Sequence, residues 1–169
     1  QDRWSMNFFY PNFQNAMWRI MGYLFFENKN YFVKSDDFDK KLNRFDKQNI
    51  IDFCTKYGIA LYDTALEVKR LQDNASDKFL EIVKITNLVD LLEKIPSCNT
   101  IVTTGQKATD VIISTFSCTK PSIGDKVNLN INNRLISFWR MPSTSRAYPL
   151  SLEKKADYYK KMFIAEKIL

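Results

Sequence analysis

The stretch RMPSTSRAYPLSLEKK, residues 140–155, brings hydroxylated, cationic and aromatic side chains together between a β-rich segment and a basic helix. It contains Ser143, Thr144, Ser145, Arg146 and Tyr148. The chain has no histidine, which excludes a histidine-based catalytic triad and any zinc site with a histidine ligand. Chemistry in this stretch would therefore use hydroxyls, backbone amides and a guanidinium group, and we expect neither a metal nor a cofactor.

The composition predicts one globular domain over residues 1–169. A chain of 169 residues that is 45% hydrophobic is long enough to bury a core. Lys and Arg outnumber Asp and Glu by 25 to 19, which gives a net charge of +6. This balance favours a polyanionic partner such as a nucleic acid, although solvated basic faces are common in proteins of other kinds.

The three cysteines indicate an intracellular protein. Cys54, Cys98 and Cys118 are odd in number, widely spaced and set beside apolar residues, as reduced packing cysteines are. The sequence contains neither a signal peptide nor an apolar run of roughly 20 residues. We therefore expect a cytoplasmic monomer that does not enter a membrane.

Hydrophobic spacing and capping residues predict five helices. Asp46, Asn87 and Ser151 are suited to cap three of them, and Gly58 to end the second. The expected helices cover residues 14–26, 47–57, 88–95 and 106–116 and a closing segment that starts at residue 152. On this last helix Leu152, Ala156, Tyr159, Met162 and Phe163 are expected inside, and Lys154, Lys155, Lys160 and Lys161 outside.

Short apolar runs predict the strands. GIALYDT (58–64) and TIVTTG (100–105) are typical of buried strands, and residues 127–131 and 134–142 form a hairpin around Asn132-Asn133. FLEIV (79–83) fits a strand or a helix, and residues 27–45 are expected to be irregular. Strands separated by helices imply a parallel sheet covered on both faces.

In such a sheet the ligand lies beyond the carboxyl ends of the strands. Three segments should meet there, YDTALEVKR, TGQKATD and MPSTSRAYP. The alternative for the third is that Pro142 and Pro149 only end a strand and start a helix.

Three motifs, in family order, resemble the uracil-DNA glycosylase superfamily, in its mismatch-specific and hypoxanthine branches. FFYPNFQNAMW (8–18) matches the family's aromatic, proline, asparagine and tryptophan positions at Phe8, Pro11, Asn15 and Trp18. GQKATD (105–110) resembles a Gly-Lys-x-Ala helix start, and MPSTSRAYPLSLEKKADYYKKM resembles the third motif, a Pro-Ser loop and helix. The resemblance spans about residue 6 to residue 163 and implies a three-layer α/β/α fold with a short, mostly parallel four-stranded sheet.

The chain departs from the family pattern in two ways. The segment between Pro11 and Trp18 is two residues longer than in the mismatch-specific branch, and Tyr10 replaces the usual histidine before the proline. The family's first motif and its central strand would precede residue 1. We therefore expect roughly 30 further residues before Gln1, as a strand and its loops require.

The resemblance implies a role for each matched position. A glycosylase must extrude the nucleotide whose base it removes, so it needs a grip on the DNA backbone and an aromatic pocket. Phe8, Tyr10 and Asn15 would form the pocket, with Asn15 as the catalytic residue because its amide both donates and accepts. The DNA-binding residues would be Lys107, Ser143, Thr144, Ser145, Arg146 and Tyr148.

Each assignment has a structural alternative. Asn15 is equally suited to cap the helix that follows it, and the aromatic residues to pack in a core. Arg146 and Tyr148 could make structural contacts, Lys107 could be a solvated lysine, and Asp63, an available carboxylate, more often serves in turns.

Three functions remain open at this point. The first is a monofunctional glycosylase that hydrolyses the N-glycosidic bond of uracil or another deaminated base in DNA. The second is a weak or inactive module of the same fold that binds damaged DNA. The third, a small-molecule or nucleotide-binding α/β domain, is disfavoured because the four glycines form no G-x-G-x-x-G loop.

Overall fold

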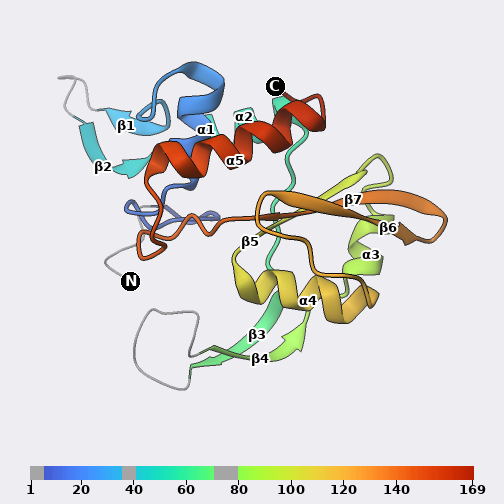
Figure 1. Ribbon diagram of the computed structural model, residues 1–169. Coiled ribbons are helices and arrows are strands. Elements are labelled where there is room, and N and C mark those ends of the chain that lie inside the picture. The colour runs from blue at the N-terminus through green and yellow to red at the C-terminus, as the bar shows by residue number, and fades with distance from the viewer. Residues whose placement is uncertain (1–5, 36–40, 71–79) are drawn as a thin grey trace. The chain divides into compact units, whose positions relative to one another are not determined.

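The computed structural model describes residues 6–35, 41–70 and 80–169. The chain divides into two units, each with its own core, and Figure 1 traces the chain through both. The first unit combines the N-terminal part up to Leu61 with the C-terminal part from Pro142 onward. The second unit is the continuous segment Tyr62–Met141.

The described residues of the first unit form three helices and one antiparallel pair of strands. The helices are α1 (Met17–Phe26), α2 (Lys47–Tyr57) and α5 (Leu152–Ala165), and β1 (Val33–Ser35) pairs antiparallel with β2 (Lys41–Phe45). Helices α1 and α5 pack against each other although they lie far apart in the sequence. The first unit therefore needs both ends of the chain.

The predicted capping residues define two of these helices. The Asp46 carboxylate accepts hydrogen bonds from the backbone N–H groups of Gln48 and Asn49 at the start of α2, and Gly58 ends that helix with a φ of 65°. The Ser151 hydroxyl accepts from the Lys154 N–H at the start of α5. Both predictions of helix starts are confirmed, because short polar side chains supply acceptors for N–H groups that have no partner inside the helix.

Aromatic rings fill the core of the first unit. Phe25 contacts Phe53, Tyr57 and Phe163 with ring centroids 5.0, 4.6 and 5.1 Å apart. These pairs connect α1 to α2 and to α5. Their geometry is mostly edge-to-face, which the electrostatics of aromatic rings favour.

Gly22 permits the chain to fold back after α1. A Cβ atom at this position would lie 2.5 Å from the Asn28 carbonyl oxygen. That oxygen belongs to backbone, which cannot move away as a flexible side chain could, so any larger residue would open the turn. The absence of a side chain thus lets residues 28–31 lie against α1.

Outside residues 71–79, the second unit contains a three-stranded sheet, a separate pair of strands and two helices. Its elements are β3 (Ala65–Arg70), β4 (Leu80–Ile85), α3 (Leu88–Glu93), β5 (Thr100–Thr104), α4 (Gln106–Phe116), β6 (Asp125–Ile131) and β7 (Arg134–Met141). In the sheet the order is β5-β7-β6, with β5 parallel and β6 antiparallel to β7. Thr104 pairs with Met141, so β5 and β7 end at the same edge.

The core of the second unit lies between this sheet and its helices. Ile136 and Phe138 of β7 are fully buried and pack with Leu92 of α3 and Ile112 of α4. Because side chains alternate between the two faces of a strand, Ile136 and Phe138 point to the same face of the sheet, as the sequence predicts for the hairpin. Asn132 and Asn133 have φ values of 50° and 62°, which the predicted tight turn requires.

The structure confirms a mixed α/β protein and corrects several predicted elements. Residues 59–63 are not a buried strand: they have no regular secondary structure, and Tyr62 is 56% exposed. Among the described residues no strand pairs with this run, which lies where the first unit ends and the second begins. The 27–45 segment, expected to be irregular, contains β1 and β2, and FLEIV falls largely in strand β4. The four-stranded, three-layer arrangement stays a prediction.

Candidate functional site

The aromatic segment, residues 8–18, is organised around Trp18. Trp18 is 2% exposed, and its indole N–H donates to the Phe9 carbonyl at 3.1 Å. The Phe8 ring stacks on Trp18 with centroids 6.4 Å apart, and the Tyr10 ring meets it edge-on at 6.3 Å. Phe8 and Tyr10 are themselves only half-buried. The segment thus holds two accessible aromatic rings on a buried indole.

Tyr10 has an unusual backbone. Its φ is 51°, in the left-handed region that costs a non-glycine residue on the order of 1 to 2 kcal/mol. The following Pro11 further restricts the conformations of the residue before it. The contacts of the aromatic segment must therefore compensate this strain, which is a feature common at ligand sites.

Asn15 forms the entry to α1. Its backbone N–H donates to the Asn12 carbonyl at 2.8 Å, and its side-chain oxygen accepts from the Met17 N–H at 2.9 Å. The side-chain NH₂ group of this half-buried residue has no acceptor within the described part of the chain. Of the two functions that its amide offers, the acceptor serves the helix start and the donor is available.

The serine turn, residues 142–148, is held through three of its carbonyl oxygens. The Tyr159 hydroxyl donates to Pro142 at 3.0 Å, the Ala16 N–H donates to Thr144 at 2.9 Å, and the Lys155 ammonium donates to Ser145 at 2.8 Å. One of these donors lies at the start of α1 and two lie on α5. The turn is therefore fixed from the inside of the first unit.

The serine hydroxyls stabilise the turn locally. Ser143 Oγ accepts from the Ser145 N–H at 3.2 Å, and Ser145 Oγ accepts from the Ala147 N–H at 3.3 Å. The Tyr148 N–H closes the turn by donating to the Ser145 carbonyl at 3.2 Å. Both hydroxyls thus act as acceptors, and among the residues that the structure describes neither hydroxyl hydrogen has a partner.

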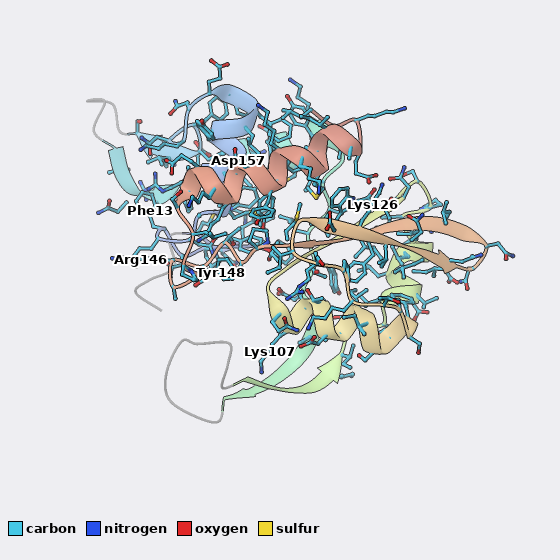
Figure 2. All side chains as sticks on the ribbon, in the orientation of Figure 1. Phe13, Lys107, Lys126, Arg146, Tyr148 and Asp157 are labelled. Carbon is cyan, nitrogen blue, oxygen red and sulfur yellow. The ribbon has the colours of Figure 1, made fainter. Side chains whose placement is uncertain are left out.

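Arg146 and Tyr148 differ in how firmly the turn holds them. The Arg146 side chain is exposed, extends away from the ribbon (Figure 2), and has no partner within the described ranges. The Tyr148 ring is half-buried and lies beneath the Lys155 ammonium, 5.7 Å from its centroid. Arg146 is therefore free to contact a ligand, whereas Tyr148 also supports the turn.

The hydrogen bond from Ala16 to Thr144 joins the aromatic segment to the serine turn. It links residues 128 positions apart in sequence, and Thr144 is 1% exposed. The structure thereby brings the two segments together within the first unit. Phe8, Tyr10, Asn15 and the residues of the serine turn are all described there.

Lys107 belongs to the second unit, as the second residue of α4. The helix begins after Gly105, whose φ of 100° is accessible to glycine and rarely to other residues. Lys107 is half-buried and has an interaction of its own. Asp63 is exposed and also lies in this unit, where its carbonyl accepts from the Thr86 hydroxyl at 2.6 Å.

The sequence analysis did not assign two residues to the site. Lys155, expected outside with its neighbouring lysines, is 3% exposed. Tyr159 is 1% exposed, as expected, but its hydrogen bond to the serine turn was not predicted. Burial lowers the pKa of the Lys155 ammonium, and burial followed by the neighbouring Tyr10 raises the pKa of Tyr159. The spacing of 155, 159 and 162 on one helix face is the signal that places Lys155 inside.

A scan against family models and searches of curated proteins and of solved structures found no match to this chain. Among the residues that the structure describes, no group of acidic, cysteine or histidine side chains is arranged to hold a metal ion. Over the same ranges, none of the helices has the length and apolar character to cross a bilayer.

Proposed function

We propose that this protein is a monofunctional DNA glycosylase that hydrolyses the N-glycosidic bond of an extruded deaminated base, uracil or a related one. The observation that carries the proposal is the hydrogen bond from Ala16 to Thr144, because it unites the aromatic segment and the serine turn. The enzyme would act as a monomer on DNA in the cytoplasm. The resemblance to the uracil-DNA glycosylase superfamily is the second support.

Base extrusion needs a stacking surface beside a grip on the backbone. Phe8 and Tyr10 supply half-buried rings whose positions are fixed by Trp18. Arg146 and the hydroxyls of Ser143 and Ser145 supply donors for phosphate oxygens, whereas Thr144 is buried and contributes through its backbone. Because the turn is held from inside by α1 and α5, its outer side can bind DNA without rearranging.

Asn15 is the proposed catalytic residue, acting through its NH₂ group. The departing base carries negative charge in the transition state, so a donor placed at a base oxygen stabilises it. The Asn15 acceptor is occupied by the Met17 N–H, which leaves the donor for this role. The reaction in this form needs neither a histidine nor a metal.

The test is an excision assay on the protein. Duplexes that carry uracil, hypoxanthine or thymine opposite guanine are incubated with the protein, and alkali then cleaves at abasic sites. Excision of at least one base supports the proposal, and intact strands at stoichiometric protein would refute it.

A second candidate is a DNA-binding module that does not cut. The engagement of Asn15 in the start of α1 favours it, because this contact is a sufficient structural reason for an asparagine at this position. Tight binding of the same duplexes in the absence of any abasic product would identify this function.

A further inference from the structure

Lys155 is a buried cation bound to the backbone of the serine turn. It is 3% exposed, and its ammonium donates to the Ser145 carbonyl at 2.8 Å. The same carbonyl also accepts from the Tyr148 N–H at 3.2 Å, and the Tyr148 ring lies 5.7 Å from the ammonium. A lysine whose only task was general attraction of an anion would stay in solvent, as its neighbour Lys154 does.

The Ser145 carbonyl that Lys155 binds belongs to the same peptide group as the Arg146 N–H. No peptide bond of the described residues is cis, so the C=O and N–H of the Ser145–Arg146 peptide point in opposite directions. With Lys155 bonded to the oxygen from the inside, the Arg146 N–H is directed away from Lys155. This N–H has no acceptor within the described part of the chain.

We propose that Lys155 is a positioning residue that prepares the Arg146 N–H to bind a phosphodiester oxygen. A cation at the oxygen of a peptide polarises it and strengthens the hydrogen bond that its N–H donates, since bonds in a chain reinforce one another. The Arg146 side chain leaves from the same residue and adds its own charge. The ligand is one phosphate of the DNA backbone, and the inference rests in this respect on the proposed function.

Lys155 could instead only hold the turn, without strengthening the hydrogen bond of the Arg146 N–H. The charge separates these two roles, because a neutral donor at position 155 can hold the turn but polarises the peptide less. Lys155→Gln keeps a donor, Lys155→Met removes it, and Lys155→Arg keeps the cation. Lys154→Gln is the matched control, because it removes one exposed charge from the same helix turn.

The test follows the Arg146 amide in proton–nitrogen correlation spectra during titration with dimethyl phosphate, a phosphodiester monoanion. In the natural protein this amide proton should move downfield and saturate. The dissociation constant should rise about tenfold in Lys155→Gln and Lys155→Met and stay within about twofold in Lys155→Arg and Lys154→Gln. The unfolding temperature of each variant shows whether it is folded.

Three outcomes would overturn the inference: no response of Arg146 in the natural protein, an unchanged constant in folded Lys155→Gln, or an equal loss in Lys154→Gln. If the neutral variants do not fold, the natural protein and Lys155→Arg still decide, since both must show the Arg146 response. The excision assay is independent of this titration. An Arg146 response without excision refutes the glycosylase proposal alone, and excision without the response refutes only the role of Lys155.

Discussion

The serine turn and the start of α4 are both polar segments that follow a strand of the sheet, and they are stabilised in opposite ways. The serine turn is held by buried donors that bind its carbonyl oxygens, as Tyr159 and Lys155 do. At the start of α4 the polar side chains bind one another: Arg140 donates to Gln106 at 2.8 Å, and Gln106 donates to Asp110.

This difference determines which segment is available to a ligand. The α4 network is completed by a salt bridge of 3.3 Å between Lys120 and Asp110, so its charged groups are already paired. In the serine turn, the Arg146 side chain and two hydroxyl hydrogens have no partner among the described residues. A polar sequence alone therefore does not show that a segment can bind a ligand. What matters is whether its polar side chains already hydrogen-bond to one another.

The largest effect is expected at Asn15. Replacement by alanine removes the donor proposed for the leaving base, and we expect turnover to fall about 100-fold while DNA affinity changes little. Single-turnover excision and equilibrium binding measure the two quantities. Asn12→Ala is the control, because the Asn12 side chain accepts from the Gln14 N–H at 2.9 Å in a similar turn. Equal losses in turnover and affinity for Asn15→Ala would contradict its catalytic role.

Tyr159→Phe tests whether the serine turn depends on α5. The change leaves the buried Pro142 carbonyl without its donor, and we expect the free energy of unfolding to fall by about 1 to 3 kcal/mol. Urea denaturation measures this loss. Tyr158→Phe, at the preceding and only half-buried position, should cost less. If Tyr158→Phe cost as much, the hydrogen bond to the turn would not be the cause.

Alkaline pH should weaken the first unit. Burial raises the pKa of Cys54 from 9.0 to about 11, so between these values the unfolded chain loses a proton that the folded chain keeps. The contribution of Cys54 is complete below pH 9, falls as the pH rises to about 11, and is on the order of a few kcal/mol at most. Unfolding curves from pH 8 to 11 should show this decline, with a smaller slope in Cys54→Ala. An unchanged slope in that variant would exclude Cys54 as the source.

The smallest effect is expected at Arg146, and it allows a direct comparison of the serine turn with the start of α4. Arg146→Ala should weaken DNA binding several-fold and reduce the slope of log affinity against log salt by about 1. Lys107→Ala, at the start of α4, should change both quantities less, because Lys107 is half-buried and has an interaction of its own. Fluorescence anisotropy over a salt series measures both variants, and a larger effect of Lys107 would reverse the comparison.

The sequence was most informative where local rules decide the structure. Asp46, Gly58 and Ser151 mark helix ends because their side chains or backbone satisfy groups only a few residues away. Alternating apolar residues and Asn132-Asn133 likewise predict the hairpin of β6 and β7. These signals are complete within a short stretch, so no tertiary contact is needed to read them.

Long-range contacts account for what the sequence did not reveal. Residues 59–63 have the composition of a strand but no partner strand among the described residues, and pairing decides whether an apolar run becomes a strand. Lys155 follows another lysine, and nothing near it in sequence indicates that the Ser145 carbonyl lies within reach. The donors of the serine turn come from 10 to 128 residues away and appear only in three dimensions.

The interruption of the first unit by the second has a consequence for biosynthesis. Residues Tyr62–Met141 are continuous, so they can fold as soon as they leave the ribosome. The first unit must wait for α5, because α1 packs on it. Phe25 can meet Phe53 and Tyr57 early in synthesis, but its contact with Phe163 forms only after α5 has been made.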